Sequence, residues 1–305
     1  MSGSLLFILV LDGLQYGLLL FLLAAGLTLV LGIMNFVNLA HGALFMLGAY
    51  IGATVFAKSN SFFIAGLIAT LGTLLIGVIV ERTTLFAFYA RSHLDQVLAT
   101  FGLILFFNEA VSVIWGPQSL YMRAPDAFSG TIHILGTNYP AYRSLVILAG
   151  LVIAIGLYLM IYRTRIGMLI RAGASNPRMV SVLGVNIRLL NTVIFGLGAG
   201  LAGFAGLMAA PILSVQPGMG NDVLIVVLVV IVIGGIGSIR GAFFGAIIVG
   251  VVDTVGRIYL PLLLRQLTDH SIADAAGPAM ASMLIYLFMA AVLAFRAQGL
   301  FAARK

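Results

Sequence analysis

No charged residue occurs between Asp12 and Lys58, and uncharged apolar stretches of similar character recur along the rest of the chain. A membrane-spanning helix needs about 20 consecutive, mostly apolar residues. Of the 305 residues, 62% are hydrophobic and 8% are charged, whereas soluble domains carry roughly 25% charged residues. Charged residues at this frequency are too few for the surface of a water-soluble fold. Most of the surface must therefore face lipid.

We expect one all-α polytopic domain, residues 1–305, with about eight transmembrane helices. The first, 5–31, has no convincing break, no basic segment before it and no clear cleavage site, so we interpret it as an uncleaved span. The other candidate ranges are 36–57, 62–80, 94–114, 144–162, 190–213, 221–238, and finally 241–256 and 279–295.

Lysine and arginine in the connecting segments predict the orientation, because cytoplasmic loops carry an excess of them. With the N-terminus outside, eleven of the 16 lie in the inner segments 81–93, 163–189, around Arg240, and 296–305. The remaining five are Lys58, Arg123, Arg143, Arg257 and Arg265. We therefore predict an outer N-terminus and an inner C-terminus, and the formal charge of +7 needs no nucleic-acid partner.

Small residues four apart recur within the apolar ranges and predict close helix packing. Gly196 and Gly200 form one such pair, and Gly241 and Gly245 form another. In lipid, small residues at this spacing let helix backbones approach each other. The first segment, "FGLGAGLAGFAG", also matches the pattern GxGxxG, but no strand precedes it, so we exclude a dinucleotide site.

Three polar residues, Asn35, Asn38 and His41, lie within the apolar range 36–57 or at its edge. On a helix, the spacing i, i+3, i+6 places them on one broad face. That face must meet protein, water or a substrate, because unpaired amides in lipid cost several kcal/mol each. Two interpretations stay open: hydrogen bonds to neighbouring helices, or the lining of a translocation path. A helix that started near Gly32 would also offer free N–H groups to a carboxylate.

Carboxylates inside membrane segments are candidates for function. Asp12, Glu109 and Asp253 are such candidates, although Asp12 and Glu109 could also reach water at an interface. We interpret the pair Asn221 and Asp222 as the N-cap of the span that follows.

The inner segment 163–190 carries five arginines interspersed with apolar residues. Asn176 followed by Pro177 predicts the start of a short helix, since proline suits the first helical turn. Gly184 can end that helix. The composition alone is typical of a basic loop on anionic lipid headgroups.

The order of residues in "GMLIRAGASNPRMVSVLGVN", residues 167–186, resembles the coupling loop of bacterial ABC transporter permeases. The similarity is greatest to the permeases for branched-chain amino acids (LivH type). "GIMNFVNLAHGALFMLGAY" and "GGIGSIRGAFFGAIIVG" are similar to two further signatures of that family, so the resemblance covers nearly the whole chain. It implies that the loop docks on an ATPase subunit through Gly167, Arg171, Ala172, Asn176, Gly184 and Asn186.

The resemblance implies a permease subunit that moves branched-chain amino acids across the bacterial inner membrane by alternating access. Its expected partners are two ABC ATPases, a second related permease and an extracytoplasmic binding protein. Because the chain has no GxxxxGK[ST] motif, partner subunits would use the ATP, and we expect no cofactor on this chain. HExxH, GxSxG and cysteine are also absent, so we do not expect an enzyme. Urea or short amides as substrates, or an ion-coupled transporter working alone, stay open.

Overall fold

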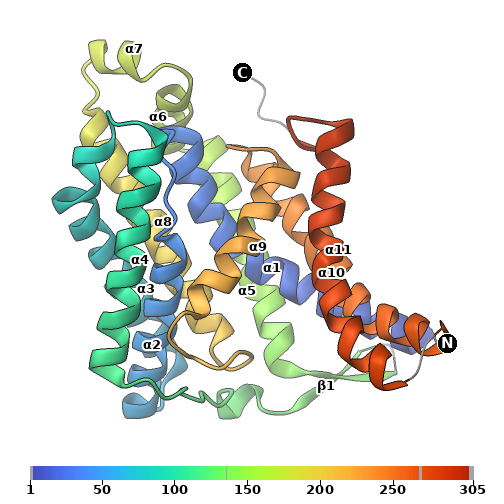
Figure 1. Ribbon diagram of the computed structural model, residues 1–305. Helices are drawn as coiled ribbons and strands as arrows, with labels where there is room; N and C mark the ends of the chain where they lie inside the picture. Colours follow the sequence, from blue (N-terminus) through green and yellow to red (C-terminus); the bar gives the residue numbers. More distant parts are fainter. Residues whose placement is uncertain (1–2, 135, 268–269, 302–305) are drawn as a thin grey trace.

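The structure is a computed structural model that describes residues 3–134, 136–267 and 270–301. Within those residues it is mostly helical (Figure 1). The long helices are α1 (Gly3–Met34), α2 (His41–Ser59), α3 (Phe62–Thr83), α4 (His93–Trp115), α5 (Ala141–Arg163), α8 (Ile187–Ala209), α9 (Met219–Gly234), α10 (Ile239–Leu267) and α11 (His270–Phe295). The short elements are η1 (Leu85–Phe88), η2 (Asp126–Phe128), α6 (Arg165–Ser175), α7 (Pro177–Val182), and the strands β1 (Thr131–Ile134) and β2 (Thr137–Pro140).

The number of apolar helices bears on the predicted topology. In the described ranges, seven helices are long and apolar enough to cross a membrane, and Met219–Gly234 and Ala279–Phe295 are shorter apolar helices. The predicted class, an all-α polytopic membrane protein, is confirmed. Termini on opposite sides of the membrane require an odd number of crossings. The seven long and two shorter apolar helices together would give nine crossings, which meets this requirement, whereas the eight predicted helices would not. The exact number of crossings and the orientation stay predictions.

The two ends of the bundle differ in what they carry. Figure 1 shows α6 and α7 at the end where α11 finishes, and the β1–β2 hairpin at the opposite end. The two strands pair antiparallel, from Thr131 opposite Pro140 to Ile134 opposite Thr137. In the predicted orientation, the end with α6 and α7 is cytoplasmic and the hairpin is external.

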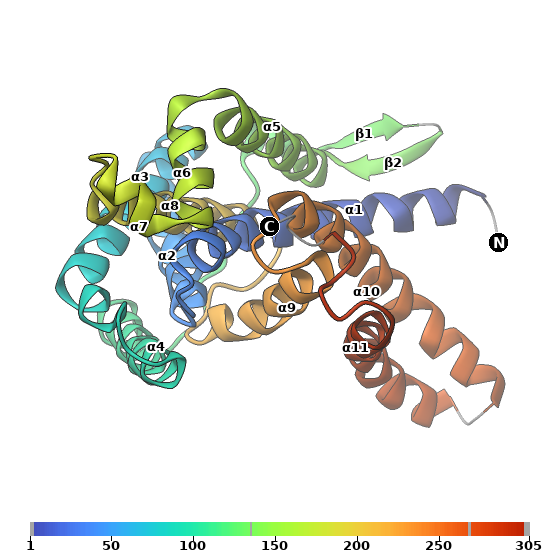
Figure 2. The same cartoon turned by 90° about the horizontal axis from the view of Figure 1, so that it is seen from above.

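The core of the bundle is formed by α1, α2 and α8, and the other long helices surround it (Figure 2). In the most apolar part of α1 and of α8, 78% of residues are buried, against 22% in α3, α4, α5 and α10. The outer faces of these peripheral helices are apolar as well: Leu71, Leu75 and Ile79 of α3 are 48–59% exposed. Such a surface is suited to lipid or to another membrane subunit.

The predicted packing glycines lie at contacts between helices. Gly196 and Gly200 on α8 face Leu74 of α3. Gly241 and Gly245 on α10 lie against Gly234 at the end of α9. In each case a glycine lets a neighbouring helix approach more closely than a larger side chain would permit.

A further close approach, between the backbones of α2 and α8, gives a test of the packing. A side chain on Gly48 of α2 would overlap the backbone of Gly203 in α8, which cannot rotate away. We expect Gly48→Leu to reduce the yield of folded, monodisperse protein in detergent about tenfold, because overpacking forces helices apart. Gly102→Leu on α4 is the matched control, since no atom lies within 4 Å of the added group. Equal yields of the two variants would contradict this packing.

Candidate functional site

The α1–α2 connection differs from the predicted helix. We expected Asn35, Asn38 and His41 on one helical face, and this is wrong, because α1 ends at Met34 and α2 begins only at His41. Asn35 has a positive φ of 49°, a conformation that asparagine tolerates better than most residues. Residues 35–40 therefore interrupt the helical path: Asn35 and Asn38 lie in this non-helical segment, and His41 is the first residue of α2.

This interruption extends deep into the bundle. The Nε2–H of His41 donates to the backbone oxygen of Leu23 over 3.2 Å. Leu23 lies 11 residues before Met34, which corresponds to about 16 Å along an α-helix. The segment 35–40 therefore descends beside α1, as Figure 1 shows, and α2 begins near mid-depth.

A second helix also begins inside the bundle. A side chain on Gly42, in the first turn of α2, would overlap the backbone oxygen of Gly220, in the first turn of α9. The N-termini of α2 and α9 therefore meet next to each other. No side chain caps either helix start. Uncapped helix N-termini carry free N–H groups and a partial positive charge.

The polar side chains at the interruption are buried and differ in their partners. His41 is bonded to Leu23, whereas the amide oxygen and nitrogen of Asn38 have no hydrogen-bond partner in the described structure. Asn38 is 2% exposed and His41 is 1% exposed. Gln96 of α4 holds the segment in place: its Oε1 accepts from the Val37 N–H over 3.2 Å. Sequence reasoning did not identify Gln96, because only the tertiary structure brings α4 to this connection.

The basic segment 163–190 forms the two short helices α6 and α7. As predicted, a helix begins at Pro177, and the Asn176 side chain caps it by accepting from the Met179 N–H over 3.0 Å. Asn186 caps α8 in the same way, through the Leu189 N–H. Gly184 follows α7 with a positive φ of 86°.

Two of the remaining loop residues pack against α5. A side chain on Gly167 would overlap the backbone oxygen of Ile161, so α6 turns sharply back on the end of α5. The Arg171 guanidinium lies 5.5 Å from the centre of the Tyr162 ring. Arg240, at the start of α10, lies 4.7 Å from the same ring. Tyr162 thus joins the loop to α10, and Ala172, which is half-buried, lies beside Arg171 on α6.

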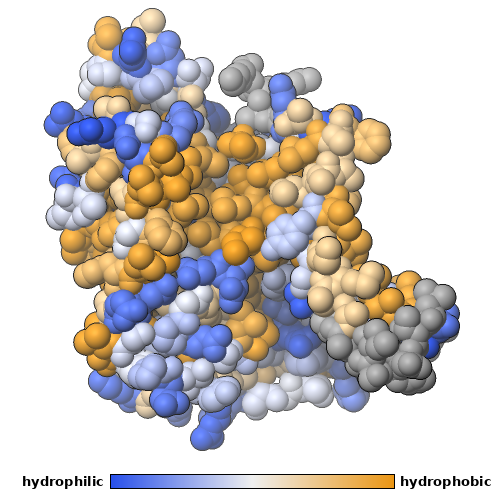
Figure 3. Space-filling view, in the orientation of Figure 1, coloured by the Kyte–Doolittle hydropathy of each residue, from blue (hydrophilic) through white to orange (hydrophobic). Residues whose placement is uncertain are grey.

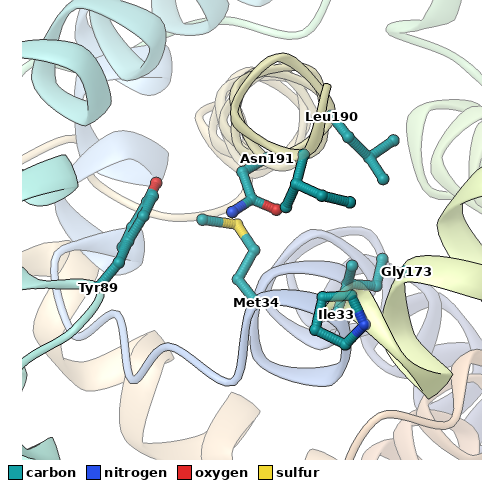
Figure 4. A pocket seen from close by; sticks show the side chains of 8 residues that line it. Ile33, Met34, Tyr89, Gly173, Leu190 and Asn191 are labelled. Carbon is teal, nitrogen blue, oxygen red and sulfur yellow. The ribbon is translucent and has the colours of Figure 1, made fainter. Parts of the chain in front are cut away.

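A cavity of about 190 Å³ lies between one part of this loop and the membrane helices. Figure 4 shows three side chains around it: Met34 of α1, Asn191 of α8, and Tyr89 of the connection between η1 and α4. Its complete lining is Ile33, Met34, Tyr89, Gly173, Pro177, Ile187, Leu190 and Asn191. The end of α1, the loop helices and the start of α8 therefore meet with space between them.

A buried carboxylate lies beside this cavity. Glu81, at the end of α3, is 1% exposed, and no cation is paired with it in the described residues. The Tyr89 hydroxyl donates to it over 2.6 Å, and the Thr192 hydroxyl donates over 2.9 Å. Burial, followed by the contact with Glu81, raises the pKa of Tyr89, so this hydroxyl stays protonated and remains a donor. The carboxylate thereby ties α3 and α8 to the η1–α4 connection.

Removing both donors from Glu81 is expected to destabilise the end of the bundle that carries α6 and α7. The variant Tyr89→Phe/Thr192→Val leaves the carboxylate buried without a partner, which costs about 3 kcal/mol. We expect a lower midpoint in thermal unfolding in detergent. Adding Glu81→Gln to this variant should restore part of the loss, because a neutral amide is less costly to bury. An unchanged midpoint would mean that water reaches Glu81.

The candidate carboxylates Asp12 and Glu109 have different environments. Asp12 pairs with Arg143 and accepts from the Tyr139 hydroxyl over 3.0 Å, which joins α1 to β2 and α5. Glu109 is exposed on α4. The predicted cap at Asn221 and Asp222 is wrong, since Gly218 occupies the N-cap position of α9 and Asp222 lies in its first turn.

A bundle of apolar helices, with a helix interrupted at mid-depth and a basic helical loop at one end, is the architecture of a membrane transport protein. The chain belongs to the family described as branched-chain amino acid transport system / permease component, whose model matches residues 9–293. It is therefore a multi-pass permease subunit of the cytoplasmic membrane, as the sequence motifs predicted.

Individual relatives agree with this family. A high-affinity branched-chain amino acid permease protein, BraD of Pseudomonas aeruginosa, is 28% identical over 263 residues, which cover 80% of this chain and 84% of the relative. LivH of Escherichia coli, of the same description, is 26% identical over 269 residues, 82% of this chain and 86% of the relative. The ribose import permease RbsC of Haemophilus influenzae is 26% identical over 242 residues, 75% and 71%. No solved structure matches the chain.

Proposed function

We propose that this chain is the membrane subunit of an ATP-driven importer for branched-chain amino acids. The observation that carries the proposal is the family membership over residues 9–293, together with an inner loop built for docking. Relatives named for branched-chain amino acids cover more of this chain than the ribose permease does. The chain itself would bind no cofactor, and ATP would be used by partner subunits.

The expected assembly contains two ATPase subunits, a second related permease and an extracytoplasmic binding protein. The apolar outer faces of α3, α4, α5 and α10 leave room for a permease partner within the membrane. The exposed loop helices α6 and α7 are the surface for an ATPase. Residues about 163–190, with Gly167, Arg171, Ala172, Asn176, Gly184 and Asn186, would transmit its movement.

The cavity at Tyr89 and Asn191 supports this role for the loop. Because a cavity lies between Gly173 and Pro177 of the loop and Leu190 and Asn191 of α8, this part of the contact can change with less repacking than a filled interface would need. The contacts of Arg171 and Arg240 with Tyr162 would carry such a shift to α10. Closure of the ATPases could then alternate access to the two sides of the membrane.

The interruption at Asn35, Asn38 and His41 is our candidate for the translocation path. Its support is the unpartnered amide of Asn38 and the two uncapped helix N-termini nearby. A buried amide without partners raises the free energy of this arrangement. An arrangement that gives Asn38 water or substrate would relieve that cost, which is the behaviour expected of a gate.

Purification from native membranes tests the proposal most directly. We expect two ATPases, a second permease and a binding protein to copurify with this chain, and we expect the complex in proteoliposomes to import leucine, isoleucine and valine with ATP. Import of ribose or urea in place of leucine would overturn the substrate assignment. Uptake by the isolated chain, driven by an ion gradient, would overturn the assignment to an ATP-driven importer.

A further inference from the structure

Two arginines from different segments meet at the end of α5. The Arg171 guanidinium, on α6, lies 5.5 Å from the centre of the Tyr162 ring, and the Arg240 guanidinium, in the first turn of α10, lies 4.7 Å from it. The two guanidiniums are therefore at most about 10 Å apart, the sum of both distances. Arg240 also lies 5.6 Å from the centre of the Tyr158 ring, which packs against Tyr162. We call these four side chains the arginine–tyrosine cluster.

The hydrogen-bonding groups of this cluster are exposed and unused. Tyr158 and Tyr162 are 45% and 40% exposed, and both arginines are exposed as well. Among the described residues, neither guanidinium and neither phenol hydroxyl forms a hydrogen bond or an ion pair. A cation–π contact uses the face of a guanidinium, so the N–H groups along its edge stay free to donate. The cluster can therefore bind an external acceptor without breaking an existing hydrogen bond.

The positive charge of the cluster is not neutralised by the neighbouring sequence. No aspartate or glutamate occurs in residues 127–221 or 223–252, which include all of α5, all of α6 and the start of α10. Arg163 and Arg165, at the junction of α5 and α6, are exposed and add two further positive charges. Such a surface is complementary to an anion, and the fork of a guanidinium matches the geometry of a phosphate group.

An apolar stripe leads away from the cluster along α5. Leu148, Leu151 and Ile155 are 60%, 37% and 60% exposed. Their spacing of three or four residues continues to Tyr158 and Tyr162, so one face of the helix carries all five. The 14 residues from the first to the last of them correspond to about 21 Å of helix. One leaflet is half of a hydrocarbon core of about 30 Å, so the stripe is long enough to contact an acyl chain.

The cluster lies where the polar end of the molecule meets its apolar surface. Figure 2, viewed from the end with α6 and α7, shows α5 and α10 on either side of α1. On the face that Figure 3 presents, hydrophilic residues gather at that end, and a hydrophobic band lies below them. Tyr158 and Tyr162 lie in the last two turns of α5, and tyrosines are enriched at membrane–water interfaces. This is the level at which lipid head groups lie.

We infer that the arginine–tyrosine cluster and the apolar stripe of α5 form a binding site for one anionic phospholipid. Arg171 and Arg240 would bind the head-group phosphate, and an acyl chain would lie along the stripe. Because the stripe belongs to a candidate membrane span, a lipid fits both parts of the site, whereas an acidic residue of a water-soluble subunit would fit the arginines alone. A bound phosphate would also hold α6 to α10. The inference does not depend on which substrate the permease imports.

The test counts the lipids bound to the purified full-length chain in detergent by native mass spectrometry. Dioleoylphosphatidylglycerol is the probe, and we expect it to bind about tenfold more tightly than dioleoylphosphatidylcholine, whose head group carries its own cation. Arg171→Gln/Arg240→Gln should weaken phosphatidylglycerol binding about twentyfold, since each arginine near a membrane surface contributes about fivefold. Arg171→Lys/Arg240→Lys keeps both charges and should recover most of this loss.

The matched control is Arg188→Gln. Arg188 is exposed at the start of α8, and its guanidinium lies 4.9 Å from the centre of the Phe86 ring. This variant therefore loses the same charge and the same kind of ring contact at another place, and it should bind phosphatidylglycerol as the unaltered chain does. An equal loss in Arg188→Gln, no loss in Arg171→Gln/Arg240→Gln, or equal binding of the two lipids would overturn the site.

Two further measurements identify the occupant. Inorganic phosphate at the concentration of the lipid should not displace phosphatidylglycerol, and displacement would assign the arginines to a free anion. The same titration of the complex with its second permease and ATPases should still detect the bound phosphatidylglycerol. Loss of the lipid in the complex would assign the cluster to a contact between subunits and would overturn the lipid site.

Discussion

The variant Val182→Asp/Leu183→Asp is expected to reduce leucine uptake about 100-fold and to separate the chain from its ATPases. Val182 and Leu183, at the end of α7, are 82% and 76% exposed, and Met179 one turn earlier is 58% exposed. Apolar side chains this exposed on a polar end of the molecule mark an interaction site. Two carboxylates there would lose their hydration on docking and would gain no partner. Copurification of ATPases, followed by uptake in proteoliposomes, measures both effects.

The control for this variant is Tyr121→Asp, an acidic change at a residue that is 86% exposed in the outer connection. It should leave ATPase binding intact. Milder changes in the loop should separate binding from coupling: Gly184→Val strains a positive φ, and Arg171→Ala removes the contact with Tyr162. In both, we expect ATP hydrolysis to continue while uptake falls. Normal uptake in Val182→Asp/Leu183→Asp, Gly184→Val and Arg171→Ala would contradict the assignment of the loop.

The architecture was predictable from the sequence because lipid imposes a strict requirement on length and polarity. The range 5–31 predicted α1 as one continuous helix, and the structure has Gly3–Met34. Asn176 followed by Pro177 predicted the start of α7, since the cap and the fixed φ of proline act locally. Features determined within one or two turns of the chain could therefore be inferred without tertiary structure.

The interruption at 35–40 was not predictable in this way. A helix buried on all sides has no apolar stripe, so hydrophobic periodicity cannot distinguish it from a buried extended segment. The range 36–57 was apolar enough for a span, and its first five residues are nevertheless non-helical. Gly32, which we considered as the interruption, lies within α1, and the conformational change comes three residues later at Asn35.

Polar contacts between segments that are distant in the sequence could not be predicted from it either. Glu81 meets Thr192, 111 residues away, and Gln96 meets Val37, 59 residues away. A carboxylate at the end of a membrane helix is ordinarily solvated, so nothing in the local sequence distinguishes Glu81 from Asp95. Asp253 was identified as a candidate from its apolar neighbours, but only the three-dimensional structure shows that its Oδ1 is buried without a hydrogen-bond partner among the described residues.

Asn38→Leu should act on stability and on transport in opposite directions. The side-chain amide of Asn38 is buried without a partner, so replacing it with an apolar group of similar size should raise stability by about 1–2 kcal/mol. If the interruption belongs to the translocation path, the same change removes the group that water or substrate would contact, and uptake should fall about tenfold. Thermal unfolding in detergent measures the first effect, and leucine uptake by the full complex measures the second.

The matched control for Asn38→Leu is Thr28→Val, because the Thr28 hydroxyl on α1 is also buried without a partner. We expect it to raise stability and to leave uptake unchanged, since it lies outside the interruption. His41→Leu is expected to lower both quantities, because His41 bonds Leu23 and fixes the start of α2. A loss of stability in Asn38→Leu would instead identify Asn38 as a residue that joins helices, and the path would then have to run elsewhere, between this chain and its permease partner.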